Sequence, residues 1–232
     1  MTASRRSRFR SLVTALAVAP LLAAGLGAAP VAGAQDLTDG GRLGGGSSQL
    51  LLPDGVAVGS IGGPELEQVG YVDPDRYVGK WYQVAAVPQP YTLQCTNDTT
   101  AEYARISPDT ISVRNSCGSA ISSDSVIEGE AKIRDAGSNA SLRVNFPQVP
   151  FQDENGPVNY RITYLADDYS VAIVGDPSRS SGFVLSRSPE LGAEQWSIVR
   201  DVVEARGWWP CAFLTVPMAG GRGDVTPLCL LP

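Results

Sequence analysis

The sequence predicts an all-β domain: an eight-stranded antiparallel up-and-down barrel that carries one C-terminal α-helix and a short ninth strand. Eight short runs of strand-like composition follow one another between residues 81 and 186, and clusters of Pro, Gly, Asn and Asp separate them. One stretch, after residue 188, has helical spacing instead. A short-linked antiparallel series without alternating helices is typical of a barrel or a sandwich, and closing the sheet removes its exposed edges.

The N-terminus is predicted to be a cleaved secretory signal peptide over residues 1–34. Four arginines precede an apolar run over residues 12–31, and the small-residue sequence Ala32-Gly33-Ala34 then provides a cleavage site. A retained transmembrane anchor is the alternative, which Pro20 and Pro30 disfavour because they interrupt the run. The arginine pattern leaves both the general secretory route and the twin-arginine route open.

The expected location of the mature chain follows from its cysteines. The first cysteine is Cys95, so no residue near the cleavage site can carry a diacylglycerol. We therefore expect an exported protein that is secreted or lies in the cell envelope, without a lipid anchor.

Residues 35–70 are predicted to form a Gly/Ser-rich flexible leader, because such a composition buries too little apolar surface to offset the entropy of ordering the chain. Two apolar patches, Leu50-Leu51-Leu52 and Val56-Ala57-Val58, interrupt this leader. We expect these patches to dock loosely on the barrel. Peripheral contact with an envelope membrane is the alternative.

Residues 71–232 are predicted to form one domain, since a segment of this length supports one sizeable core. Asp73-Pro74-Asp75 predicts a turn that leads into the first strand. The expected strands cover residues 81–87, 99–106, 110–115, 125–133, 141–146, 158–165, 170–174 and 182–186.

The helix is expected to begin at Ser188 and to end before Gly207. Ser188 suits the N-cap, Pro189 the first helical position and Glu190 the positive end of the helix dipole. A short ninth strand is expected over residues 212–216. The apolar side of the helix should comprise Leu191, Ile198, Val199, Val202 and Ala205.

Three short motifs occur in order along the domain. Gly79-Lys80-Trp81 opens the first expected strand, Ala166-Asp167-Asp168-Tyr169 precedes the seventh, and Arg187 follows the eighth. They resemble the three motifs of the lipocalin family, and residues 71–217 are most similar to bacterial lipocalins and to apolipoprotein D. The resemblance implies four structural motif residues: Gly79, Trp81, Asp167 and Arg187.

The resemblance also implies a barrel that encloses one small ligand, which an eight-stranded barrel has room to hold. The family counterparts of Trp81 and Arg187 point inward at the closed end. There, a guanidinium over an indole face provides a structural cation–π contact of about 1–2 kcal/mol. We expect this pair to seal the barrel and not to bind the ligand.

The inward orientation of Trp81 and Arg187 predicts which residues line the cavity, because successive side chains of a strand point to opposite faces of the sheet. Alternation from Trp81 and Arg187 assigns Gln83, Ala85, Phe183 and Leu185. Alternation combined with the similarity to apolipoprotein D adds Tyr103, Asn115, Leu142, Val144 and Phe146, and more loosely Ile127, Tyr160 and Ile162. A mostly apolar and aromatic lining with few polar groups is typical of a small-molecule site, although such residues also fill ordinary cores.

Four cysteines in an exported chain predict two disulfides, for which three connectivities exist. Cys95 and Cys117 lie at nearly equal distances on either side of the turn at residues 107–109, so a hairpin would bring them together. Cys211 would then pair with Cys229. The alternative is a bridge from Cys95 to Cys229, which would resemble the bridge in apolipoprotein D.

Composition disfavours several other functions. The chain has no His, which removes the commonest general base and the usual ligand of zinc and haem. The net charge of −6 and the pI near 4.7 disfavour nucleic-acid binding. The glycine-rich runs do not lie between a strand and a helix, as a nucleotide-binding loop would require. We predict no catalytic residue, no cofactor and no metal site.

The sequence therefore predicts a secreted lipocalin that binds and sequesters or transports a small hydrophobic ligand, such as a fatty acid, a lysophospholipid or another envelope lipid. It is not expected to be an enzyme. Two alternatives remain: a lipocalin-fold enzyme that acts on a lipid or an isoprenoid, and an envelope interaction module whose barrel is plugged by its own side chains.

Overall fold

The computed structural model describes residues 63–120 and 124–232. The expected signal peptide and both apolar patches of the expected leader lie outside the described residues. The described strands are β1 (Gly79–Ala86), β2 (Cys95–Ser107), β3 (Thr110–Ser119), β4 (Ser125–Ile133), β5 (Ser141–Asn145), β6 (Tyr160–Leu165), β7 (Val171–Gly175), β8 (Gly182–Ser186) and β9 (Leu214–Thr215). The helices are α1 (Pro74–Tyr77) and α2 (Ala193–Ala205), with short 3₁₀ turns at Pro90–Thr92, Pro210–Ala212 and Leu228–Leu230.

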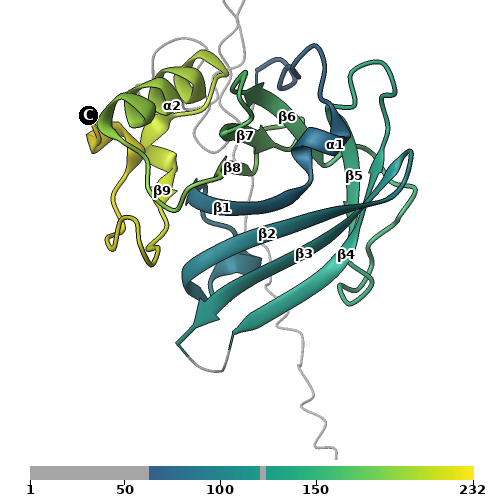
Figure 1. Cartoon of the computed structure of the whole chain (residues 1–232), viewed down its shortest axis with the longest axis horizontal. Coiled ribbons are helices and arrows are strands. Elements are labelled where there is room, and N and C mark those ends of the chain that lie inside the picture. Colours follow the sequence, from purple (N-terminus) through teal and green to yellow (C-terminus); the bar gives the residue numbers. More distant parts are fainter. Residues whose placement is uncertain (1–62, 121–123) are drawn as a thin grey trace, which may run out of the picture. The chain divides into compact units, whose positions relative to one another are not determined.

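The strands form one closed antiparallel barrel (Figure 1). Hydrogen bonds link them in the order β2-β3-β4-β5-β6-β7-β8-β1-β9, and β1 also pairs with β2, which closes eight strands into a ring. The ninth strand adds to β1 through the pairs of Ala85 with Thr215 and Ala86 with Leu214. The predicted eight-stranded up-and-down barrel with a C-terminal helix and a short ninth strand is confirmed.

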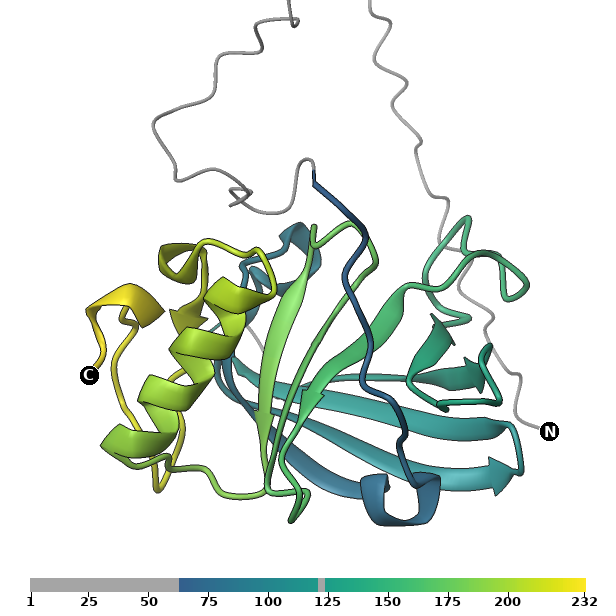
Figure 2. The same ribbon diagram turned by 90° about the horizontal axis from the view of Figure 1, so that it is seen from above.

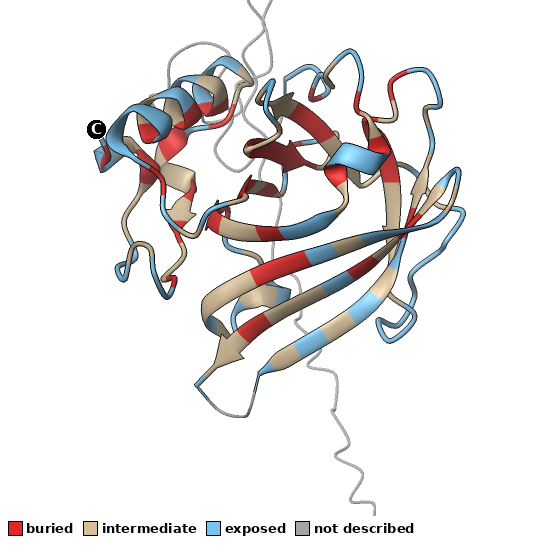
Figure 3. Cartoon of the chain, viewed as in Figure 1, coloured by how far each residue is buried: buried red, intermediate tan, exposed pale blue. Residues whose placement is uncertain are grey.

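Side chains on the two faces of the barrel strands enter two separate cores. Val184 packs under α2, in a cluster with Trp196, Val199 and Val203, whereas its neighbour Leu185 lies with Trp81 in the cluster inside the barrel. Figure 3 shows intermediate and exposed positions alternating along β4. Leu185 therefore faces the inside of the barrel, as alternation predicts, and Val184 faces the outside.

Helix α2 begins later than predicted. Gly192 takes the N-cap position, and the Ser188 hydroxyl instead accepts a hydrogen bond from the amide of Glu190 in a local turn. The intervening segment stays non-helical and carries Leu191, which is 5% exposed, into the core under the helix. The end of the helix is as predicted, since Gly207 follows it with a φ of +84°.

The apolar face of α2 also differs from the prediction. Trp196, Val199 and Val203 are buried at a spacing of three and four residues, which is one face of a helix. Ile198 is 43% exposed and Ala205 is also exposed, so neither belongs to this face. Among the described residues, no helix combines the length and the apolar character that crossing a bilayer requires.

The end of the expected flexible leader is ordered. From the open end of the barrel to the closed end, the amides of Leu66, Val69 and Val72 donate to the carbonyls of Pro177, Ile162 and Ser138, at 2.8, 2.9 and 2.7 Å. Leu66 is 1% exposed, and the Arg161 guanidinium donates to its carbonyl. Figure 2 shows this dark blue segment running across the barrel to α1. The prediction of a flexible leader is wrong for residues 64–70, because Leu66 and Val69 anchor them on the barrel.

Candidate functional site

The barrel contains a cavity of about 460 Å³. It opens between the loops that join β1 to β2, β5 to β6 and β7 to β8, which contribute Tyr91, Val149 and Ser180 to its mouth. Ligand pockets in proteins commonly measure about 300–1,000 Å³, so this cavity is of ligand size. Four large apolar side chains around the mouth are exposed: Tyr91, Leu93, Val149 and Phe151.

Ten of the twelve residues predicted to bind the ligand line this cavity. They are Gln83, Tyr103, Asn115, Ile127, Leu142, Val144, Phe146, Tyr160, Phe183 and Leu185. They come from seven different strands, so no single stretch of sequence builds the site. Closure of the sheet brings them together.

The two remaining predicted residues, Ala85 and Ile162, lie outside the lining. The pairing of β1 with β8 shifts register between Gln83 and Ala85, and Ala85 therefore pairs with Val184 and enters the core under α2. The prediction for Ala85 is wrong because simple alternation does not anticipate this bulge. Ile162 is buried in the same inner cluster as Trp81 and packs beside the cavity without lining it.

The closed end of the barrel is sealed by Arg187 and Trp81. The Arg187 guanidinium carbon lies 3.7 Å from the centroid of the Trp81 ring. Its Nη1 donates to the carbonyl of Lys80 at 2.8 Å, and its Nη2 lies within 3.0 Å of the carbonyls of Arg76, Tyr77 and Val78. Burial lowers the pKa of this guanidinium, which nevertheless stays charged because arginine ionises far above neutral pH. All of these contacts hold the fold together.

The other two motif residues have backbone roles. Gly79 has a φ of +99°, and a Cβ atom built on it would lie 3.2 Å from Nη1 of Arg187. Asp167 accepts a hydrogen bond through its backbone carbonyl, from Nη2 of Arg76 at 3.1 Å. The Arg76 guanidinium also lies 3.8 Å from the centroid of the Tyr169 ring, which ties α1 to the β6–β7 turn.

Three tyrosines form a hydrogen-bonded cluster at the floor of the cavity. The Tyr160 hydroxyl lies 2.7 Å from that of Tyr77 and 3.3 Å from that of Tyr103. The rings of Tyr77 and Tyr103 stack, with centroids 5.8 Å apart. Burial raises the pKa of Tyr77 and of Tyr160 well above the ordinary value, and raises that of Tyr103 to about 12. All three hydroxyls are therefore neutral near pH 7.

Sequence reasoning missed several lining residues. Ile111 and Val113 line the cavity from β3, and alternation back from Asn115 identifies both. Tyr77 lies in α1, outside the strands, so no strand periodicity points to it. Gln89 and Tyr91 lie in the loop after β1, whose course over the mouth has no signal in the sequence.

The surface of the cavity is mostly apolar, although Gln, Asn, Ser and Thr side chains also contribute to its lining. Asn115 Oδ1 is buried and has no hydrogen-bond partner among the described residues. The described lining includes no Lys or Arg, and Asp176 at the mouth is its single charged side chain. Burial acts to raise the pKa of Asp176, but hydrogen bonds from Ser178 and Ser181 outweigh it and lower the pKa.

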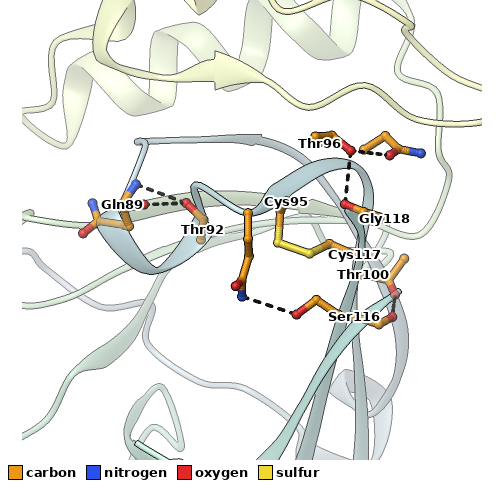
Figure 4. The surroundings of a disulfide bond; sticks show 11 residues. Gln89, Thr92, Cys95, Thr96, Thr100, Ser116, Cys117 and Gly118 are labelled. Carbon is orange, nitrogen blue, oxygen red and sulfur yellow. Dashed lines mark hydrogen bonds between the residues drawn. A yellow bond between two sulfur atoms is a disulfide. The ribbon is translucent and has the colours of Figure 1, made fainter. Parts of the chain in front are cut away.

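The disulfides pair as the hairpin argument predicted: Cys95 with Cys117, and Cys211 with Cys229. The first disulfide lies at the mouth of the cavity, where both of its cysteines belong to the lining (Figure 4). Beside it, Gln94 Nε2 donates to the Ser125 hydroxyl at 3.3 Å and so joins the loop after β1 to β4. The alternative bridge from Cys95 to Cys229 is excluded by this pairing.

A closed antiparallel barrel that is sealed at one end and holds a mostly apolar cavity defines a class of protein that binds small molecules inside its fold. The family model described as a lipocalin-like domain matches residues 72–218. The chain belongs to the lipocalin family.

Two relatives and one solved structure are similar to this chain. The chain is 35% identical over 146 residues to temperature-induced lipocalin-1 of Arabidopsis thaliana, covering 60% of this chain and 76% of the plant protein. It is 25% identical over 143 residues to a lipocalin of Acanthamoeba polyphaga mimivirus, covering 59% of this chain and 79% of the viral protein. Insecticyanin from the tobacco hornworm Manduca sexta is similar with a TM-score of 0.49 and 18% identity, over 71% of this chain and 94% of insecticyanin. The finer resemblance to bacterial lipocalins and apolipoprotein D stays a prediction.

Proposed function

We propose that this protein is exported and reversibly binds a small hydrophobic molecule inside its barrel, in order to sequester or transport it. The observation that carries the proposal is the cavity of about 460 Å³, whose surface is mostly apolar. An envelope lipid with one long apolar chain, such as a fatty acid or a lysophospholipid, has the shape that this cavity accommodates. Two disulfides agree with export, because disulfides persist in oxidising compartments.

The affinity should increase with the apolar length that is buried. Each buried methylene contributes about 0.8 kcal/mol, which is roughly a fourfold gain in affinity, until the cavity is filled. From the sum, the cost of immobilising the ligand, about 4–15 kcal/mol, must be subtracted. A homologous series of ligands should therefore show affinity that rises steadily with chain length and then levels off.

The test begins with native mass spectrometry of the protein purified from its natural compartment, to identify lipids that co-purify with it. The protein is then delipidated and titrated with Nile red, an uncharged apolar fluorophore, and the bound probe is displaced with lipids of increasing chain length. Brightening of the probe and displacement that depends on chain length would support the proposal. Failure to bind the probe or any lipid would contradict it.

Neither alternative function gains support. A plugged barrel would leave no cavity of ligand size, whereas these side chains leave about 460 Å³. For an enzyme, the described lining provides one carboxylate, Asp176, and its two oxygens are already engaged by the amides and hydroxyls of Ser178 and Ser181. We therefore propose binding without catalysis.

Peripheral contact with a lipid surface is a further part of this proposal. Tyr91 and Val149 belong to the mouth, and Leu93 and Phe151 are exposed on the same two loops, so the cavity would face any apolar surface that these residues touch. Co-sedimentation with vesicles of phosphatidylcholine, which has no net charge, tests this contact. Binding that is lost in the double variant Leu93→Asp, Phe151→Asp would support it, and absence of binding by the unaltered protein would contradict it.

A further inference from the structure

The tyrosine cluster at the cavity floor has one hydrogen-bond donor more than it uses. Tyr77, Tyr103 and Tyr160 contribute three hydroxyl hydrogens, but the structure contains two hydrogen bonds among them. Within the described part of the chain, these hydroxyls contact no other hydrogen-bonding group. One phenolic hydrogen is therefore left to donate to a molecule in the cavity.

Asn115 presents the complementary group in the same cavity. Its buried Oδ1 has no partner among the described residues, and leaving a buried acceptor without a donor is unfavourable. On β3 it lies two residues beyond Val113, whose partner on β2 is Tyr103. Diagonal positions of this kind lie about 7–8 Å apart between Cα atoms, so the unpaired acceptor lies close to the tyrosine cluster, on its mouth side.

The charges around the cavity are unfavourable for an anion. The described lining has no Lys or Arg, and its one charged side chain, Asp176, is negative. Arg187 lies beneath the floor, where four backbone carbonyls and the face of Trp81 engage its guanidinium. An anionic headgroup at the floor would therefore be buried without contact to a cation of the described lining, which is unfavourable.

We propose that the cavity selects ligands whose inserted end is uncharged and carries a hydroxyl group, such as a long-chain or isoprenoid alcohol, in preference to fatty-acid anions. A hydroxyl both donates and accepts, so it matches the unpaired Asn115 oxygen and the unpaired phenolic hydrogen, whereas a carboxylate only accepts. The inference rests on the proposed function and narrows its ligand class.

The test compares three fluorescent ligands with the same polyene chain: cis-parinaric acid, its methyl ester and the corresponding alcohol. At pH 7.5 the acid is ionised, the ester accepts hydrogen bonds without donating, and the alcohol does both. We expect the dissociation constant of the alcohol to be at least tenfold lower than that of the acid, with the ester between them. Acid binding as tightly as the alcohol would overturn the preference for an uncharged end, and ester binding as tightly as the alcohol would overturn the role of the hydroxyl.

Two matched variants assign the effect to the cavity. Asn115→Leu removes the unpaired acceptor and should reduce the advantage of the alcohol over the acid to less than threefold. Asn145→Leu is the control, because Asn145 Oδ1 is also buried without a partner among the described residues but lies in a groove on the outer face of β5. This control variant should keep the full affinity advantage of the alcohol over the acid. An unchanged advantage in Asn115→Leu would overturn the assignment to Asn115.

The outcomes separate this inference from the proposed function. If the acid binds at least as tightly as the alcohol, the protein is a lipid binder whose selectivity we have assigned wrongly. If none of the three ligands binds and Nile red does not bind either, both proposals are wrong.

Discussion

Arg187 lies over the Trp81 ring at 3.7 Å while its guanidinium donates to the carbonyl of Lys80, the residue that precedes Trp81 in β1. Arg187 follows directly after β8, so this contact fastens the last strand of the barrel to the first. The Trp81 indole is fully buried and donates to the Tyr77 carbonyl at 2.8 Å. The closed end is therefore one hydrogen-bonded unit, and the cavity begins above it.

Gly79→Ala should destabilise the protein by about 1–3 kcal/mol. Gly79 has a φ of +99°, which L-residues rarely adopt, and the added methyl group would press on Nη1 of Arg187 at 3.2 Å. Urea unfolding measures the change in the free energy of unfolding. Gly70→Ala is the control, since a Cβ atom there meets nothing within 4 Å, and it should change stability by less than about 0.5 kcal/mol. Equal stability of the two variants would contradict the assigned role of Gly79.

Removal of the two disulfides should have the same effect on stability and different effects on binding. Each closes a short loop, with sequence separations of 22 and 18, so each pair of Cys→Ser changes should cost about 3 kcal/mol. Cys95 and Cys117 lie in the cavity lining, whereas Cys211 and Cys229 lie outside it in the C-terminal segment.

The measurement is the rate at which bound Nile red dissociates, determined by stopped flow in protein that remains folded. The double variant of Cys95 and Cys117 should release the probe several-fold faster, because the disulfide holds the two strands that form one side of the mouth. The double variant of Cys211 and Cys229 should release it at the unaltered rate. Identical rates in both would show that the first disulfide does not restrain the mouth.

How far the sequence predicts the fold depends on the range of the interactions involved. Residue alternation and turn composition are local, and they correctly predicted the eight strands and the inward position of residues such as Phe183 and Leu185. The bulge between Gln83 and Ala85 depends on how β8 and β9 fit against β1, which is a tertiary effect. Alternation alone therefore put Ala85 on the wrong face.

The same distinction explains the other errors. Ser188 and Pro189 have good N-terminal helix propensity, but Leu191 must cross to the core under α2, and the helix begins only after Gly192. Weak local composition suggested flexibility near residue 66, yet the buried Leu66 side chain and the hydrogen bond from the Leu66 amide to the Pro177 carbonyl hold this segment on the barrel. Tyr77 joins the cavity floor from α1, a position that strand periodicity does not address.

Alkaline pH should destabilise the protein through the buried tyrosines. The pKa of Tyr103 is about 12 in the folded protein, against an ordinary value of about 10, and those of Tyr77 and Tyr160 are also raised. Above about pH 10 the unfolded chain loses phenolic protons that the folded chain retains, so the contribution of these tyrosines to the free energy of unfolding is constant below about pH 10 and falls as the pH rises towards 12.

Absorbance at 295 nm measures tyrosine ionisation, and circular dichroism measures folding. We expect a part of the eight tyrosines to ionise only together with unfolding. In the variant Tyr160→Phe, fewer tyrosines should ionise together with unfolding. Reversible ionisation of all tyrosines near pH 10 with the barrel intact would contradict the buried cluster.

The last prediction tests which face of the barrel wall holds the ligand, with two neighbouring residues of β4. Ile127 lines the cavity, whereas Val126 is 45% exposed on the outer face. Ile127→Asp places an unpaired carboxylate in the apolar space and should weaken Nile red binding at least tenfold, because desolvating that charge is costly. Val126→Asp adds the same charge to the same strand in contact with water, so the probe affinity should stay within about twofold and stability within about 0.5 kcal/mol. The opposite pattern, with binding lost in Val126→Asp and retained in Ile127→Asp, would mean that the ligand lies against the outer wall and that the cavity is not the binding site.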